Sequence, residues 1–169
     1  RKVFDKTPVG QTRLLTSDDY EPCCGTPLYD AMGFTLTAMR KYVKDMEDAA
    51  VVVTIITDGY ENSSREYNGL TIKALIEKLR KEGWTFTYMG ANQDATEVAM
   101  SMSIRNARNF DYNSEGTRES MRKDASTRMN FFSRLAKMRG DDAAAPMSRE
   151  ERQSAYSRMA DEAFDEEEK

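Results

Sequence analysis

Histidine is absent from the sequence, and this absence excludes Ser-His-Asp triads, Cys-His dyads and histidine-ligated zinc. The only two cysteines, Cys23 and Cys24, are adjacent, and adjacent residues form a disulfide only with strain and with little gain in loop entropy. We therefore expect a reducing compartment. Any metal ion in this protein should be held by oxygen atoms.

A broad basic surface and a membrane-spanning segment are also missing. The formal net charge is -4, and acidic residues are concentrated at 161–169. Such a chain offers no field that would hold nucleic acid or anionic lipid. The longest mainly apolar stretch, 49–56, is too short to cross a bilayer, and no signal peptide stands at the front. We predict a soluble protein, cytoplasmic or associated with a virion, that binds neither nucleic acid nor membrane.

The apolar residues that are present alternate between helical and extended patterns. Spacings of three and four over 26–45 predict a helix with Thr26 as its N-cap. The β-branched run at 51–57 is typical of a strand covered on both faces of a parallel sheet. The same reasoning predicts further strands at 84–89 and 107–112, and further helices at 72–79, 94–102 and from Ser114 onward. This alternation predicts an α/β fold, a doubly wound and mostly parallel sheet with helices on both faces.

The amino-acid composition changes after Gly140, so we divide the chain into a domain at 1–139 and a linker, helix and acidic tail at 140–169. The last helix begins with a Ser148/Glu151 capping box. Its thin apolar stripe favours a solvated helix with a disordered acidic end, and a docking helix is the alternative. That stripe contains Ala155, Met159 and Ala163, whereas the helix before it should bury Met121, Ala125, Met129, Phe132 and Leu135.

The strand at 51–57 ends in Asp58, and ligands of open α/β sheets collect outside the carboxyl ends of strands. Thr26, at a junction between loop and helix, should face the same edge. A hydroxyl and a carboxylate offer the hard oxygen ligands that Mg²⁺ prefers. The alternatives are structural, with Asp58 as a turn residue and Thr26 as a plain N-cap.

Other polar residues near this edge are expected to shape local structure. Asp30, in the first helical turn, carries a charge favourable to the helix dipole. Helix-start or capping roles are predicted for Ser63, Ser64 and Glu66, and for Asn92, Gln93 and Asp94.

Three stretches are similar to the von Willebrand factor A-type (vWA) family, particularly its bacterial and phage-borne intracellular members. They are GTPLYDAMG at 25–33, VVVTIITDGYENSSREY at 51–67 and GWTFTYMGANQD at 83–94. In that family a divalent cation, Mg²⁺ or Mn²⁺, sits at a metal-ion-dependent adhesion site. The resemblance implies that Thr26 is its threonine ligand and Asp58 its aspartate ligand.

The family's remaining ligands come from a DxSxS loop after the first strand, and this sequence contains no such motif. The resemblance therefore implies that the first strand, first helix and second strand lie upstream of Arg1, which agrees with a chain that opens without methionine. The strand carrying Asp58 would then have an unpaired edge, at a cost of about 1 to 3 kcal/mol per buried unpaired group. We expect a fold incomplete at its N-terminus, an incomplete metal site, and another chain or an upstream segment that completes the sheet.

The resemblance implies a divalent-metal-dependent protein-binding module in which an acidic side chain of a protein partner completes the metal shell. The alternative is a structural or assembly component of a larger complex, such as a phage particle or an ATPase adaptor. The sequence contains no paired nucleophile and base and no phosphate-binding glycine loop, so an enzyme is not expected. A metal-dependent hydrolase using Asp58 is the third hypothesis.

Overall fold

The protein is built on a three-stranded parallel sheet, which we describe from a computed structural model that covers residues 2–19, 25–91, 94–140 and 147–165. Cys23, Cys24, Asn92 and Gln93 lie outside the described residues, so the expectations for them are not addressed. The strand order is β1-β2-β3, and both pairings are parallel. The strands are β1 (Val52–Thr57), β2 (Thr85–Ala91) and β3 (Asn106–Phe110).

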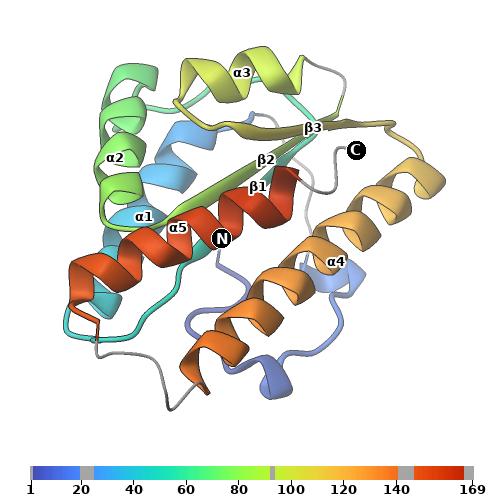
Figure 1. The fold of residues 1–169 in the computed structure, drawn as a ribbon. Helices are drawn as coiled ribbons and strands as arrows, with labels where there is room; N and C mark the ends of the chain where they lie inside the picture. The colour runs from blue at the N-terminus through green and yellow to red at the C-terminus, as the bar shows by residue number, and fades with distance from the viewer. Residues whose placement is uncertain (1, 20–24, 92–93, 141–146, 166–169) are drawn as a thin grey trace.

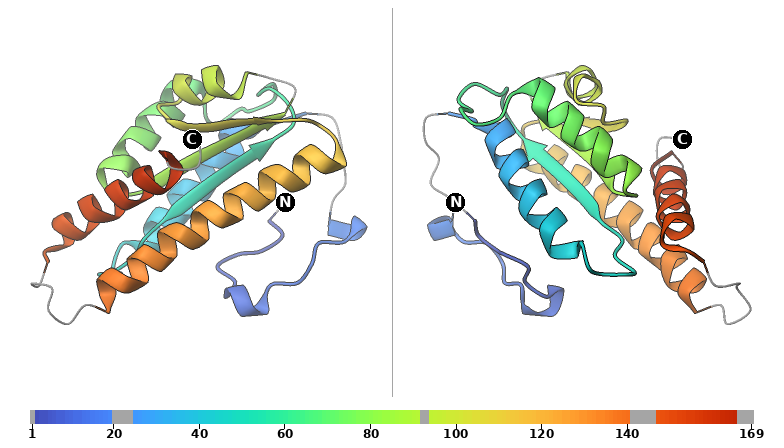
Figure 2. Two further views of the ribbon diagram at one scale, coloured as in Figure 1. Left: turned by 45° about the vertical axis from the view of Figure 1, so that its right-hand side comes forward. Right: turned by 90° about the vertical axis from the view of Figure 1, so that its left-hand side faces the viewer.

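Helices cover both faces of the sheet (Figures 1 and 2). Side chains of alternate strand residues point to opposite faces, so Ile55 and Phe86 enter one core and Val52 enters the other. The first core lies against α1 (Leu28–Val43), α2 (Gly69–Lys81) and α3 (Ala95–Ser101). The predicted α/β fold with helices on both faces is therefore confirmed.

The second core joins α4 (Ser114–Arg139) to α5 (Arg149–Asp165). Its buried members are Phe131, Leu135, Tyr156, Ala160 and Ala163. The interpretation of the last helix as solvated is wrong, because α5 buries its apolar side against α4 and the sheet. None of the helices in the described ranges combines the length and the apolar character that a membrane span requires.

The buried face of α4 differs from the predicted stripe. Met121, Met129 and Phe132 are 38%, 73% and 45% exposed. The helix turns a partly polar side to the sheet, where Arg128 forms a 2.7 Å ion pair with Asp124 and donates to the Thr54 hydroxyl of β1. The buried residues are Ser120, Asp124, Thr127, Phe131 and Leu135, so only Leu135 of the predicted stripe is buried.

Strand β1 lies at the edge of the sheet, whereas every residue of β2 is buried. The prediction that β1 is covered on both faces is therefore wrong in part, and Ile56 is 47% exposed. Ile56 points to the same face of β1 as Thr54, where α4 contacts the strand through Arg128, so the partly polar side of α4 leaves this face only partly covered.

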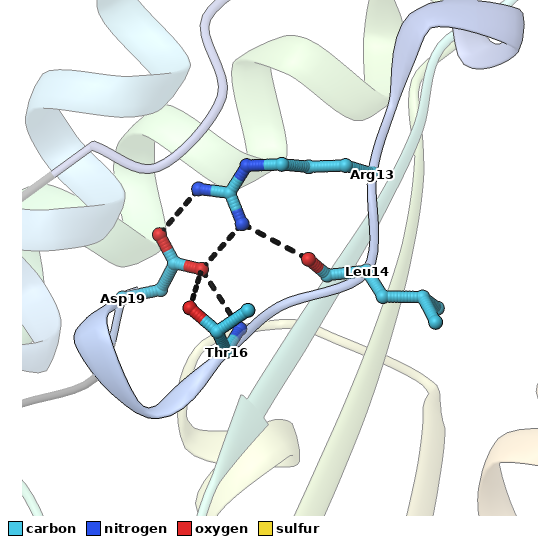
Figure 3. Close-up of polar contacts among 4 residues, drawn as sticks. All are labelled: Arg13, Leu14, Thr16 and Asp19. Atoms are coloured by element: carbon cyan, nitrogen blue, oxygen red, sulfur yellow. Dashed lines mark hydrogen bonds and ion pairs between the residues drawn. The ribbon is translucent and has the colours of Figure 1, made fainter.

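The N-terminal segment 2–19 contains no buried residue and no strand, so it does not pair with the open edge of β1. It consists of loops and two short 3-10 helices, Val9–Gln11 and Ser17–Asp19. Figure 3 shows how it is held: Arg13 donates two hydrogen bonds, of 2.5 and 2.6 Å, to Asp19, and Thr16 donates to the same carboxylate. The guanidinium of Arg13 and the Thr16 backbone hold the pKa of Asp19 far below its usual range.

Candidate functional site

The candidate site lies where β1 ends, and a tight turn presents Asp58 there. The Thr57 hydroxyl donates to the Gly59 carbonyl at 2.9 Å and accepts from the Gly59 N–H at 3.3 Å. Because Thr57 is buried and fixes the turn, the exposed Asp58 side chain is placed at the carboxyl edge of the sheet. This is the edge at which ligands of parallel sheets bind.

Thr26 is held against the same turn, although it lies more than thirty residues earlier in the chain. Its N–H donates to Asn62 Oδ1 at 2.8 Å, and its carbonyl accepts from the Asn62 N–H at 3.2 Å. A Cβ added at Gly59 would lie 3.3 Å from Thr26 Oγ1. The structure thus brings the Thr26 hydroxyl beside the residue that follows Asp58.

The start of α1 is capped by another loop and not by Thr26. The N-cap is Pro27, which makes no side-chain capping bond, so the predicted N-cap role of Thr26 is wrong. The loop between β1 and α2 replaces it: Glu61 accepts from the Tyr29 N–H at 2.8 Å, and Ser64 Oγ accepts from the Asp30 N–H at 3.0 Å. The Thr26 hydroxyl is consequently not needed to cap the helix.

Glu61 is the centre of this capping loop. Besides the Tyr29 N–H, its carboxylate accepts from the N–H groups of Ser63 and Ser64 at 2.9 and 2.7 Å, and from the Ser64 hydroxyl at 2.7 Å. The pKa of Glu61 is the net result of two opposing effects. Partial burial is the largest single effect and by itself would raise the pKa. The hydrogen bonds from Ser64, Tyr29 and Ser63 together outweigh it, and the pKa is lowered.

Asp30 fixes the second half of the same loop. Its carboxylate accepts from the N–H groups of Arg65, Glu66 and Tyr67 at 2.9, 2.9 and 2.8 Å. These bonds, of which that from Arg65 has the largest effect, lower the pKa of Asp30 against an opposing effect of desolvation. Asp30 is therefore a loop-binding residue as well as a charge near a helix start. We call the bonds made by Asp30, Glu61, Asn62 and Ser64 the loop clamp.

Of the described residues between 63 and 94 predicted to start or cap helices, one has that role in the structure and three do not. Asp94 caps α3 as predicted, because its side chain accepts from the Glu97 N–H at 3.0 Å. Ser63, Ser64 and Glu66 do not start α2, which begins at Gly69 behind a capping box formed by Asn68 and Thr71. The roles of Glu61 and Asn62 had no sequence signal, since their partners lie in a different element.

The oxygen atoms at this edge differ in their availability to a metal ion. The carboxylates of Asp30 and Glu61 are occupied by backbone N–H groups of the loop clamp, so they serve structure. Asp58 is exposed and the Thr26 side chain is half-buried. No group of three or more acidic or cysteine side chains that could hold a metal occurs in the described ranges. Thr26 and Asp58 are hard oxygen donors that fit part of an Mg²⁺ shell.

Comparison of the chain with family models, with curated proteins and with solved structures gives no match.

Proposed function

We propose that the chain is a divalent-metal-dependent protein-binding module of the vWA type, in which Thr26 and Asp58 contribute ligands to Mg²⁺ or Mn²⁺. The loop clamp is the observation that carries this proposal. It holds Thr26 beside Gly59, and the Thr57–Gly59 turn presents Asp58, so two oxygen donors distant in sequence lie at the edge where ligands of parallel sheets bind.

Binding is favoured over catalysis by the donors at this edge. Thr26 and Asp58 supply two protein ligands, whereas Mg²⁺ takes near-octahedral coordination, so other positions are left for water, a partner carboxylate and residues outside this chain. A bound cation would supply an electrostatic anchor for an acidic side chain of a protein partner. The fixed loop would present that cation at an exposed surface.

Mn²⁺ binding to the chain, followed by electron paramagnetic resonance, tests the proposal. We expect weak binding because the ligand set is partial. Asp58→Ala should weaken it at least about tenfold, since even outer-shell partners contribute about 10- to 100-fold to metal affinity. Gly59→Ala should also weaken it, because the added methyl group would press on Thr26 Oγ1 at 3.3 Å.

Asp45→Ala is the matched control, because Asp45 is an exposed carboxylate beyond the far end of α1. It should bind Mn²⁺ like the wild type. Equal Mn²⁺ binding by Asp58→Ala and the wild type would overturn the metal site. In the complete protein, EDTA and Asp58→Ala should both abolish partner capture.

A second candidate, a structural or assembly role, is favoured by the open edge of β1. The strand carries neither charge nor proline, the features with which proteins protect edge strands. The exposed apolar side chains of α4 are Met121, Met129 and Phe132. This exposed stripe adjoins the edge, because Arg128 reaches Thr54 on β1 and Phe132 lies one turn further along α4. We propose that another chain, or an upstream segment, adds a strand to β1 and covers this stripe.

Without that strand the chain should self-associate through β1. Analytical ultracentrifugation of wild type is expected to give a weight-average mass above 19.3 kDa that rises with concentration. Ile56→Lys places a charge on the edge and should return the mass toward the monomer value. Met100→Lys, at an exposed position of α3, is the control and should not. A monomeric wild type at high concentration would contradict the open edge.

A further inference from the structure

Helix α4 has a second apolar side, which none of the described elements covers. The exposed stripe of Met121, Met129 and Phe132 is continued by Ala125 and Ala136, which are also exposed. Along the helix these positions are three or four residues apart, so their side chains lie on one side of α4. The exposed stripe is about 22 Å long, at 1.5 Å per residue. An apolar side of this length that faces solvent is typical of a helix that binds a further element.

The exposed stripe lies on the side of α4 that faces the open edge of β1. Arg134, on the opposite side of α4, forms a 3.7 Å ion pair with Glu162 of α5. Arg128, next to the stripe, donates to Thr54 of β1 instead. Figure 1 shows α4 and α5 next to each other on one face of the sheet, and α5 contacts β2. A strand added to β1 would extend this face, and a helix beside α4 would cover it.

The charges on the solvent side of α4 are mainly basic. Arg118 and Arg122 are exposed on this side and form no ion pair within the described part of the chain. Lys123, by contrast, is paired with Glu119 at 2.9 Å. Glu115 adds one negative charge in the first turn. The first half of the exposed stripe therefore lies among basic side chains, and acidic residues of a partner would be attracted to it.

A second copy of the chain would fit this surface poorly. In an antiparallel pairing of two α4 helices about Met129, Arg122 of each helix would come close to Lys137 of the other. In a parallel pairing, Arg118 and Arg122 would each meet their own counterpart. Both arrangements set basic side chains against each other, which is unfavourable. The N-terminal segment 2–19 buries no residue and does not cover the exposed stripe either.

We propose that the exposed stripe binds an amphipathic helix of a partner protein, which has a leucine-like apolar side and acidic residues facing Arg118 and Arg122. This inference rests on the proposed assembly role, and it names the chemistry of the partner. The apolar side of the partner helix removes Met129 and Phe132 from water, which supplies affinity. The acidic residues supply orientation and selectivity, because exposed ion pairs contribute little affinity but oppose a basic partner.

Two designed helical peptides, each about 20 residues long, test this surface. They share a leucine side, and one carries glutamate beside it where the other carries lysine. Fluorescence anisotropy with the whole chain should show saturable binding of the glutamate peptide, and binding of the lysine peptide should be at least about tenfold weaker.

Met129→Gln should weaken binding of the glutamate peptide about tenfold, because a large apolar side chain is lost from the interface. The helix should persist, since glutamine and methionine have similar helix propensities. Met100→Gln on α3 is the matched control, because Met100 is 64% exposed and Met129 is 73% exposed. It should bind the glutamate peptide like the wild type.

Exchanging charges distinguishes this docking surface from non-specific binding. Arg118→Glu combined with Arg122→Glu should reverse the preference, so that the lysine peptide binds more tightly than the glutamate peptide. Lys81→Glu combined with Arg105→Glu changes the net charge by the same amount at exposed positions outside α4. This control should keep the preference of the wild type.

The proposal is overturned if neither peptide binds, if both bind equally, or if Met129→Gln binds the glutamate peptide like the wild type. It is also overturned if Met129→Gln lowers the mass of the chain in analytical ultracentrifugation, since a second copy would then cover the stripe. A complete protein that no longer binds the glutamate peptide would overturn it as well, since a segment of its own would then cover the stripe. Ile56→Lys tests the edge of β1 separately, so failure of strand addition and failure of helix docking give different results.

Discussion

Gly33→Ala should destabilise the protein by about 1 to 3 kcal/mol, the usual cost of forcing an extra methyl group into a packed site. The opposite result holds for an exposed helix, where alanine is about 1 kcal/mol better than glycine. Gly33 lies buried in α1, and a Cβ there would overlap three atoms of the Tyr67 ring. Glycine at this position is therefore explained by the ring that covers it.

The Tyr67 ring has little freedom to move away. Its own N–H is held by Asp30 at 2.8 Å, and the ring makes an edge contact with Phe34 at a centroid distance of 5.3 Å. The clash at Gly33 should consequently displace the loop between β1 and α2. We expect Gly33→Ala to weaken Mn²⁺ binding as well as stability, because that loop contains the partners of Thr26.

Urea unfolding followed by circular dichroism measures the effect of Gly33→Ala. Gly10→Ala is the control, since an added Cβ at Gly10 meets nothing within 4 Å. Combining Gly33→Ala with Tyr67→Leu should cost less than the sum of the two single substitutions, because the smaller side chain makes room. A Gly33→Ala protein as stable as the wild type would show that the ring is not packed on α1.

Local sequence patterns predicted the strands and helices well. The β-branched run ends at Thr57 as observed, and the helix predicted over 26–45 is found at Leu28–Val43. Gly83, which follows the next helix closely, has a φ of +84°, a conformation that glycine adopts at no steric cost. These features depend on residues a few positions apart, and periodicity reports on such neighbours.

Contacts between distant segments were not predictable in the same way. Nothing in the spacing of Glu61 or Asn62 shows that their partners are Tyr29 and Thr26, over thirty residues away. The buried side of α4 was predicted from the spacing of its apolar residues alone. That spacing takes no account of Arg128, whose bonds to Thr54 and Asp124 turn a partly polar side of the helix toward the sheet. The position of β1 at the edge likewise depends on which strands are its neighbours, and its composition does not encode this.

Low pH should loosen the loop clamp, and this is the second large effect that we expect. The pKa values of Asp30 and Glu61 are lowered in the folded protein from reference values of 3.8 and 4.5. A lowered pKa means that the native state binds fewer protons than the unfolded chain. The contribution to stability is therefore complete above the reference values and is lost as the pH falls through the folded-state pKa values.

Glu61→Gln should make this dependence visible. Losing the charged acceptor of four hydrogen bonds should cost about 1 to 3 kcal/mol at neutral pH, because charge-assisted bonds are among the stronger ones. The difference in unfolding free energy between wild type and Glu61→Gln should shrink as the pH falls below 4.5, where Glu61 of the unfolded wild-type chain binds a proton, and should vanish once the pH has passed the lowered pKa of the folded state. Asp30→Asn should behave in the same direction.

Chemical denaturation at a series of pH values measures this difference, with Glu97→Gln as the control for an exposed glutamate on α3. That control should follow the wild type at every pH. Other native carboxylates with lowered pKa values, such as Glu82 beside Arg40, contribute equally to wild type and variant and cancel in the comparison. A gap between wild type and Glu61→Gln that stays constant with pH would mean that the charge of Glu61 does not hold the loop. Thr26 would then lack the support on which its part in the proposed metal site depends.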